Sequence, residues 1–322
     1  MHRRVSKYVS LLCKEQACGR FLGEILPHAP VRCLFSFRIE GVARLLVTPA
    51  DIPSFMHAVH LAATEGLPYA VLGGGSNLLP PDQEYNGVLF STKCLNRVSV
   101  CGGNFKAECG TGLNRLILMA RDRERGGLAP LYGIPATVGG AVYMNAGAHA
   151  TAIADCFRGA LLFDPLRNEK HFFTHADMDF SYRSSCLQRN KRLVLLYACF
   201  SLYEQASTQI SASIANVIEI RRKTQPLSFP SAGSAFRRPH EGVEVWRLVD
   251  ACGLRGFSVG GAQISEKHAG FIVNRGGATA CDVRELITLV QERVYAKFGL
   301  ALTPEIEFLQ SDGPCGICRP LP

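Results

Sequence analysis

The sequence of 322 residues has no apolar run that approaches the roughly 20 residues of a membrane-spanning helix. Its short apolar patch near the N-terminus is interrupted by Lys14, Glu15 and Gln16, which argues against a secretory signal. Internal repeats and low-complexity tracts are absent as well. We therefore expect a cytoplasmic protein with no membrane partner, and the length suggests roughly two or three compact units.

Charged residues make up only 19% of the chain, against 47% hydrophobic residues, and this composition is typical of a globular protein with a substantial core. The net charge of +8 is spread along the sequence, without the aromatic and basic pattern of an RNA-binding module. The charge suits an anionic small molecule, or it is the mild excess of a solvated surface. We expect no nucleic-acid partner.

The thirteen cysteines are odd in number and lack a regular spacing. We interpret them as reduced thiols and not as a disulfide framework. Cys315 and Cys318 form a C-x-x-C pair in a Pro-rich tail, with no second pair nearby, so we predict no zinc site and no other metal. We expect the tail and the N-terminal stretch to be disordered.

Apolar spacing predicts helices alternating with short strands, which is typical of an α+β fold. The predicted helices cover residues 51–65, 113–125, 208–222, 243–252 and 282–298. The predicted strands cover residues 69–72, 88–91, 97–101 and 105–109, and Gly or Asn turns between them favour a sheet built from hairpins. Residues 227–239 are expected to be a loop, and a domain boundary is expected near residues 204–212.

Two glycine-rich stretches are candidates for ligand binding. LGGGSNLL, residues 72–79, combines three flexible glycines with a Ser and an Asn, which is the chemistry of a phosphate cradle. It fits neither the Rossmann nor the Walker pattern, and a tight turn between strands is the alternative. Residues 133–149 are uncharged and suit a flat apolar group, or they form a packing segment of small residues. Together they favour a large ligand with phosphates and a ring system.

Seven motifs occur in the order that is seen in UDP-N-acetylenolpyruvoylglucosamine reductases. They are SFRIEGVA (36–43), GGGSNLL (73–79), YGIPATVGGAVYMNAGA (132–148), FSYRSS (180–185), PSAGSAFRRP (230–239), GGAQISEKHAGFIVN (260–274) and LTPE (302–305). The chain resembles this family over about residues 30 to 308. The interval between Arg183 and Ser234 is too short for the extra loop of the longer class, so the chain resembles the second, shorter class.

The resemblance implies an FAD-binding domain of the vanillyl-alcohol-oxidase (PCMH) type and a smaller α+β substrate-binding domain. Residues 1–66 would then be the N-terminal part of the FAD-binding module, 67–206 the FAD-binding domain, 207–303 the substrate-binding domain, and 304–322 a segment returning to the FAD module, with a tail. The implied activity is reduction of UDP-N-acetylglucosamine enolpyruvate to UDP-N-acetylmuramate by NADPH through FAD, in peptidoglycan precursor synthesis. We expect a monomer.

Three catalytic residues follow from the resemblance. Arg183 would offer a planar, always charged fork to the substrate carboxylate, and Glu305, if protonated in a dry site, would donate a hydrogen bond to the same carboxylate. Ser234 would protonate the neighbouring carbon. Because a free serine hydroxyl is a poor acid, we expect other donors to hold Ser234. Outside these motifs the same residues would be interpreted as a surface ion pair, a turn former and a solvated acid.

The resemblance also assigns binding residues. Tyr182, Arg238 and Lys267 would bind the UDP-sugar, and Arg221 would meet the flavin or the NADPH phosphate. The residues expected to hold FAD are Gly73, Gly74, Gly75, Ser76, Asn77, Leu78, Gly133, Ile134, Thr137, Gly139, Gly140, Asn145 and Arg221.

The chain departs from the family pattern at Ala136, Glu40 and Thr303, none of which is a proposed catalytic group. Thr224 stands where the family usually has a substrate-binding Lys, and we expect Lys223 to compensate. Two alternatives are a sugar or alcohol oxidase of the same FAD-binding superfamily and a non-catalytic protein that binds flavin or a nucleotide sugar. The combination of Arg, Ser and Glu favours the reductase.

Overall fold

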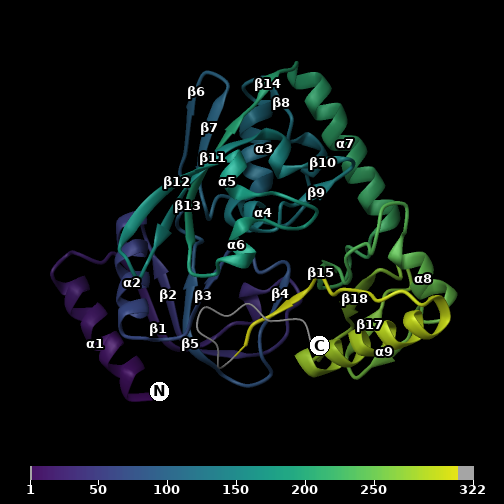
Figure 1. Ribbon diagram of the computed structural model, residues 1–322, viewed down its shortest axis with the longest axis horizontal. Helices are drawn as coiled ribbons and strands as arrows, with labels where there is room; N and C mark the ends of the chain where they lie inside the picture. The colour runs from purple at the N-terminus through teal and green to yellow at the C-terminus, as the bar shows by residue number, and fades with distance from the viewer. Residues whose placement is uncertain (1, 311–322) are drawn as a thin grey trace.

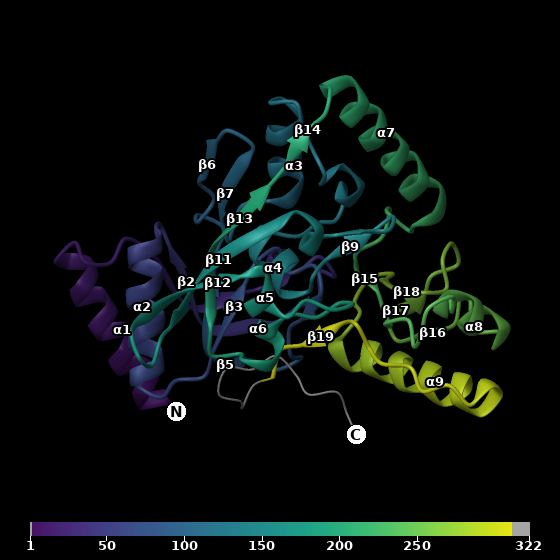
Figure 2. The same ribbon diagram turned by 45° about the horizontal axis from the view of Figure 1, so that its top comes forward.

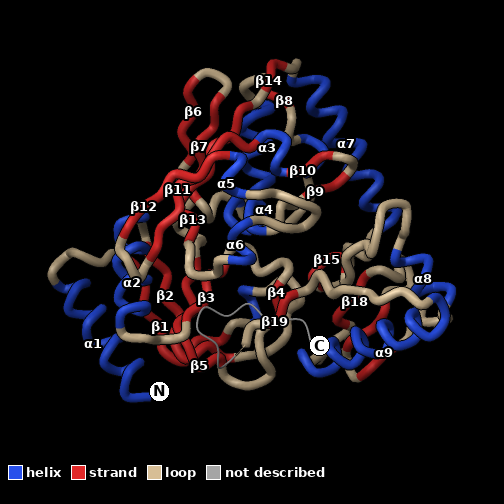
Figure 3. Tube along the Cα trace, in the orientation of Figure 1, coloured by secondary structure: helices blue, strands red, loops and turns tan. Residues whose placement is uncertain are grey.

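The computed structural model describes residues 2–310 of the chain. Its strands form a four-stranded sheet in the N-terminal part, a five-stranded sheet above it in Figure 1, and a second four-stranded sheet in the C-terminal part. Figure 3, in the same orientation, separates the helices from the strands. Cys315 and Cys318 lie outside the described residues. Among residues 2–310, no helix is both long and apolar enough to span a membrane.

The first sheet has the order β1-β2-β5-β3 and is partly parallel. β1 and β2 form an antiparallel hairpin, whereas β5 runs parallel to both β2 and β3. The predicted hairpin between residues 69–72 and 88–91 is therefore wrong, because the glycine-rich connection between these strands crosses over instead of turning back. The strands are β1 (Gly23–Pro30), β2 (Val42–Pro49), β3 (Tyr69–Leu72) and β5 (Tyr85–Ser91).

Helix α1 (His2–Ala17) corrects the expectation of a disordered N-terminal stretch. Val5, Tyr8 and Leu12 recur on one face of the helix and are buried. The Tyr8 hydroxyl donates a hydrogen bond of 2.9 Å to the Ala58 carbonyl of α2 (Ile52–Thr64). Figures 1 and 2 both show α1 beside α2, so this apolar face anchors the N-terminal segment.

The second sheet is antiparallel throughout, in the order β12-β11-β13-β7-β6, and its β6–β7 hairpin confirms the one predicted over residues 97–109. The helix predicted over residues 113–125 ends at Arg121 instead, because Glu124 adopts a left-handed φ of 55° and the chain then enters β8. The strands are β6 (Val98–Cys101), β7 (Asn104–Glu108), β11 (Phe157–Asp164), β12 (Glu169–Thr174) and β13 (Val194–Ser201).

Short helices and strands surround this second sheet. The helices are α3 (Leu113–Arg121), α4 (Val138–Tyr143), α5 (His175–Met178) and α6 (Cys186–Arg189), with the 3-10 turns η2 (Ala129–Leu131) and η3 (Ile153–Cys156). The 3-10 turn η1 (Arg32–Leu34) lies instead between β1 and β2, beside the first sheet. The strand pairs are β8 (Arg125–Gly126) with β14 (Tyr203–Glu204) and β9 (Gly147–Ala148) with β10 (Thr151–Ala152).

The C-terminal sheet, in the order β15-β18-β17-β16, packs against α9. Strand β15 lies within residues 227–239, so the expectation of a loop throughout that stretch is wrong; β15 pairs with β18. The Asp82 carboxylate accepts hydrogen bonds from the first two amides of α9. The elements are β15 (Ser231–Ser234), β16 (Ser258–Val259), β17 (Ala262–Ile264), β18 (Phe271–Asn274), α8 (Val245–Ala251) and α9 (Ala280–Phe298).

Helix α7 (Ser207–Thr224) runs from the second sheet towards the C-terminal part (Figures 1 and 2). Its buried Ile210 and Ile214 belong to the largest apolar core, which also holds α1, α2 and the facing sides of the first two sheets. A separate core lies under α9 and the C-terminal sheet. The chain therefore forms two main packed units, with α7 packed on the first.

The loop that follows β3 is held by segments from both ends of the chain. Near the N-terminus, the Ser36 amide donates to the Gly75 carbonyl at 3.0 Å, and the Ser36 hydroxyl donates to the Ser231 carbonyl of β15 at 2.6 Å. Near the C-terminus, β19 (Glu307–Phe308) pairs in parallel with β4 (Leu78–Leu79). These contacts fix the glycine-rich loop at the junction of the two packed units.

Candidate active site

A cavity of about 530 Å³ opens at this junction, between the glycine-rich loop, the segment that leads into α4, and the strands β15 and β19. Of the nineteen site residues predicted from the sequence, fifteen line it. They are Gly73, Gly74, Gly75, Ser76, Asn77, Leu78, Ile134, Thr137, Gly139, Gly140, Arg183, Arg221, Ser234, Arg238 and Glu305. The four that do not line it are Gly133, Asn145, Tyr182 and Lys267.

The three glycines of the loop are required by close packing. A Cβ atom on Gly73 would lie 2.3 Å from the Thr137 hydroxyl, and one on Gly75 would lie 2.0 Å from the Leu34 carbonyl oxygen. Gly75 also has a φ of +58°, which L-residues rarely adopt. The missing Cβ atoms thus make room for neighbouring segments of the protein, and the glycine backbone lines the cavity wall. Such a cradle fits the diphosphate of a dinucleotide.

Arg221 of α7 supplies a positive charge to the same cavity. Its side chain lies over Gly133, where a Cβ atom would come within 2.9 Å of Nε. Burial lowers the pKa of Arg221, and no acidic side chain among residues 2–310 forms an ion pair with it. A buried guanidinium without a carboxylate fits an anionic ligand, so Gly133 acts by making room for this arginine.

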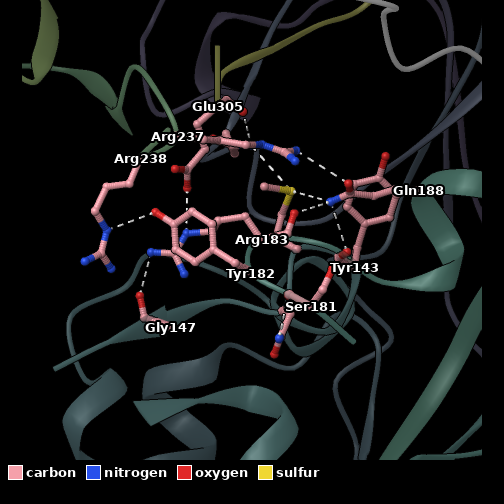
Figure 4. Close-up of polar contacts among 12 residues, drawn as sticks. Tyr143, Gly147, Ser181, Tyr182, Arg183, Gln188, Arg237, Arg238 and Glu305 are labelled. Carbon is pink, nitrogen blue, oxygen red and sulfur yellow. Dashed lines mark hydrogen bonds and ion pairs between the residues drawn. The ribbon is translucent and has the colours of Figure 1, made fainter. Parts of the chain in front are cut away.

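Arg183 and Glu305 form an ion pair inside the cavity (Figure 4). Arg183 Nε donates to Glu305 Oε1 at 2.9 Å, and its terminal nitrogen donates to the Gly147 carbonyl at 2.7 Å. Burial raises the pKa of Glu305, although Arg183, Arg237 and Arg238 oppose the shift. A carboxyl group that keeps its proton more readily than usual can donate a hydrogen bond to an anion.

Ser234 ends β15 and faces the cavity, with Phe271 of β18 as its strand partner. The expectation that other donors hold Ser234 finds no support, because within residues 2–310 no hydrogen bond to its hydroxyl is formed. The hydroxyl is exposed in the open cavity. Its orientation is therefore free to adjust to a bound ligand.

The remaining predicted residues have other contacts. Tyr182 is 46% exposed, and its ring lies 5.2 Å from the Arg183 guanidinium and 5.3 Å from that of Arg238. Asn145 uses its side-chain amide on the backbone, donating to the Ser181 carbonyl at 2.9 Å. Lys267 donates to a backbone carbonyl near the end of α7.

Lys223, expected to replace the missing lysine at position 224, lies outside the cavity. Its ammonium pairs with Glu219 one turn earlier on the exposed face of α7. The Thr224 hydroxyl donates to the Ile220 carbonyl at 2.8 Å. The arrangement gives no support to the expected compensation.

Several functional candidates escaped the sequence analysis. Glu307 lines the cavity two residues beyond Glu305, and burial raises its pKa to about 7. The Tyr143 hydroxyl donates to Glu307 at 3.4 Å. The alternation of Glu305 and Glu307 along one extended segment was a usable signal, because residues two apart share a face. Gln188 gave no such signal, because its side chain bonds mainly to backbone carbonyls, which are the same whatever the residue type.

Residues 43–166 match the family described as FAD binding domain. Together with the glycine cradle and the buried arginine, this match defines a flavoprotein oxidoreductase built on an FAD-binding domain of the PCMH type. Residues 225–309 match the family described as UDP-N-acetylenolpyruvoylglucosamine reductase, C-terminal domain. The predicted fold class, an FAD-binding domain with a smaller α+β domain, is thereby confirmed.

The chain belongs to the UDP-N-acetylenolpyruvoylglucosamine reductase family. A reductase of this name from Caldicellulosiruptor bescii is 43% identical over 288 residues, which cover 89% of this chain and 91% of the relative. A reductase of the same name from Thermotoga maritima is 39% identical over 276 residues, which cover 85% of this chain and 95% of the relative. The crystal structure of the Thermus caldophilus reductase superposes with a TM-score of 0.76 at 32% identity, covering 90% of this chain and all of that one.

Proposed function

We propose that the protein reduces the enol ether double bond of UDP-N-acetylglucosamine enolpyruvate to give UDP-N-acetylmuramate, a step of peptidoglycan precursor synthesis, with FAD and NADPH. The relatives carry the name of this reductase at about 40% identity over most of the chain. The observation that supports the proposal most directly is the meeting of the Arg183–Glu305 pair and Ser234 in one glycine-lined cavity.

Bound FAD would supply hydride transfer between NADPH and the substrate. The loop of Gly73, Gly74 and Gly75 would hold its diphosphate, because it lines the cavity and offers a ligand only backbone groups. Arg221 would neutralise phosphate charge in the same cavity. Asn145 would act indirectly, by holding the Ser181 carbonyl.

Arg183 and Glu305 would prepare the substrate for hydride attack. An enol ether is electron-rich, so a hydride adds to it only if the adjacent carboxylate accepts the developing charge. The Arg183 guanidinium is already oriented by two hydrogen bonds, which lowers the entropic cost of meeting a carboxylate. Glu305, in its protonated form, would donate a further hydrogen bond to that carboxylate.

Ser234 would then donate a proton to the carbon next to the carboxylate. Its exposed hydroxyl at the end of β15 is compatible with direct contact to the substrate. The basicity of the enolate-like intermediate would drive the transfer, because serine is a weak acid. Water in the open cavity would restore the proton.

Tyr182 and Arg238 would bind the nucleotide end of the substrate. Arg238 Nε donates to the Tyr182 hydroxyl at 3.4 Å, and both residues lie beside Arg183 (Figure 4). Arg238 lines the cavity and offers its charge to the substrate diphosphate. Lys267, proposed for the same diphosphate, would have to release its carbonyl partner at the end of α7 first.

The division of the chain follows the same proposal. Residues 1–66, 67–206 and 304–322 would form the FAD-binding module, and residues 207–303 the substrate-binding domain, with α7 as the connecting helix that packs on the FAD-binding module. By the family resemblance we expect a monomer that acts in the cytoplasm. Size-exclusion chromatography with light scattering measures the oligomeric state.

The test is an anaerobic experiment on the purified flavoprotein in two steps. NADPH is added to reduce the flavin, and UDP-N-acetylglucosamine enolpyruvate is then added while flavin absorbance is followed. We expect prompt reoxidation by the wild type. Ser234→Ala should be reduced normally but reoxidised about 100-fold to 10,000-fold more slowly, the range for loss of a general acid. Ser258→Ala, in the same sheet but outside the cavity, is the matched control.

Two outcomes would contradict the proposal. A reduced flavin that ignores the enolpyruvyl sugar but reacts readily with oxygen would favour a sugar or alcohol oxidase. Absence of flavin from the purified protein would contradict the assignment of the glycine-rich loop.

A further inference from the structure

Gln188 of α6 connects the catalytic arginine to two other parts of the site (Figure 4). Its side-chain nitrogen lies 3.0 Å from the Arg183 carbonyl oxygen, 3.3 Å from that of Tyr143 and 3.2 Å from the Met144 sulfur. Its side-chain oxygen is 3.5 Å from a terminal nitrogen of Arg237. One glutamine thus faces the Arg183 turn, the end of α4 and the C-terminal unit.

The backbone at Arg183 needs external support. Arg183 has a left-handed φ of 54°, a conformation that is unfavourable for a residue with a Cβ atom. It lies in a four-residue turn in which Ser181 and Ser184 exchange backbone hydrogen bonds of 3.1 Å. Asn145 holds the first end of this turn through the Ser181 carbonyl. Gln188 holds the Arg183 carbonyl itself, so it fixes the point from which the catalytic side chain extends.

The other contacts of Arg183 are made by its side chain. They go to Glu305 and to the Gly147 carbonyl, inside the cavity. In the proposed function a substrate carboxylate has to be bound by the same guanidinium, so part of these contacts rearranges in each turnover. The hydrogen bond from Gln188 lies on the backbone side and is not in competition with the substrate.

We propose that Gln188 is a positioning residue for the second half of the reaction, which keeps the Arg183 backbone in place while its guanidinium binds the substrate carboxylate. This inference rests on the proposed function. It assigns to Gln188 no contact with the substrate. A displacement of about 1 Å in a positioned catalytic group lowers a rate by about 100-fold, so a small backbone shift at Arg183 is enough to be measured.

The experiment separates the two half-reactions in the holoprotein by anaerobic stopped flow. Gln188→Met keeps the length of the side chain but removes its hydrogen bonds, and Gln188→Glu keeps an acceptor towards Arg237 but removes the donor to the Arg183 carbonyl. We expect both variants to bind FAD and to be reduced by NADPH within about twofold of the wild-type rate. We expect reoxidation by UDP-N-acetylglucosamine enolpyruvate to slow by about 10-fold to 100-fold in both.

The matched control is Gln263→Met. Gln263 also donates from its side chain to a backbone carbonyl, that of Gly256 at 3.0 Å, but it lies in β17 outside the cavity. This variant should lose some stability and keep both half-reactions at the wild-type rate. Thermal unfolding of all three variants gives the stability lost in each case.

The outcomes distinguish the inference from the proposed function. If wild-type protein is reoxidised by the substrate and Gln188→Met behaves like Gln263→Met, the inference is refuted and the proposed function stands. Reoxidation of Gln188→Glu at the wild-type rate would also refute it, since the Arg183 carbonyl then needs no donor. If the wild type itself is not reoxidised, the proposed function fails and the role of Gln188 falls with it.

Discussion

Glu307 makes the folded protein less stable as the pH rises towards neutrality, the opposite of the effect of a salt-bridged carboxylate. Burial in the cavity wall raises the pKa of this carboxyl from 4.5 to about 7, although Lys191, Arg237 and the Tyr143 hydroxyl oppose the shift. The folded protein therefore holds the proton more tightly than the unfolded chain does. By linkage, the free energy of unfolding falls as the pH rises from 4.5 to about 7, and the loss is complete above that.

The interval between 4.5 and about 7 sets the size of the effect. At about 1.4 kcal/mol per pH unit, the ionised Glu307 lowers the stability at pH 8.5 by at most about 3 kcal/mol. Glu307→Gln is neutral at every pH and still accepts a hydrogen bond from Tyr143. It should therefore be more stable than the wild type at pH 8.5 by up to about 3 kcal/mol, and nearly equal at pH 4.5.

Thermal unfolding of the purified holoprotein between pH 4.5 and 8.5 tests this reasoning. At about 2 °C per kcal/mol for a chain of this size, the variant should gain about 5 °C in Tm at pH 8.5. Glu292→Gln, on the exposed face of α9, is the control for a lost surface charge. Parallel pH profiles for Glu307→Gln and the wild type would refute the argument, because Lys191 and Arg237 would then stabilise the ionised carboxylate as much as burial penalises it.

Three further changes test the packing. Gly75→Ala should abolish FAD retention, because its Cβ would lie 2.0 Å from the Leu34 carbonyl oxygen; the ratio of flavin to protein absorbance measures this. Gly253→Ala is the control and should retain FAD, because Gly253 also has a left-handed φ but no atom within 4 Å of an added Cβ. Asp82→Ala removes the acceptor for two α9 amides and should lower the free energy of unfolding, measured in urea, by about 1 kcal/mol. An unchanged urea midpoint would mean that water replaces the carboxylate. Tyr8→Phe removes a buried hydrogen bond to the Ala58 carbonyl, which keeps its helical partner, and should also cost about 1 kcal/mol. No loss would show that α1 depends on apolar packing alone.

The helices were largely predictable because their signals are local. The apolar stripe from Val283 to Val294 places α9 correctly, and the prediction begins only two residues late. The helix starts there because Thr279 is its N-cap and forms a capping box with Asp282, while Asp82, far away in the sequence, accepts the amides of Ala280 and Cys281. Helix α1 was missed because polar residues dominate its sequence, although Val5, Tyr8 and Leu12 carry the apolar period.

The sheet pairing and the site depend on contacts between distant residues, which no local pattern encodes. The parallel register of β3 and β5 was not predictable from their composition. Arg183 and Glu305 are 122 residues apart, and only the family resemblance brought them together. The resemblance assigns roles to residues but does not predict the hydrogen bonds that each site residue makes. It placed Asn145 among the residues that hold FAD, for example, whereas the Asn145 side-chain amide donates to the Ser181 carbonyl and Asn145 does not line the cavity.

The joining of β4 to β19 has a consequence for how the protein is made. Asn77 of the glycine-rich loop donates to the Glu305 carbonyl, 228 residues further along the chain, and β19 begins only two residues later. At roughly 5–20 residues per second, a ribosome needs on the order of tens of seconds to synthesise the intervening chain. Until then the glycine-rich loop lacks both the contact of Asn77 with Glu305 and the pairing of β4 with β19. We therefore expect stable capture of FAD to be a late event, and a chain truncated before Glu305 to lack one wall of the cavity.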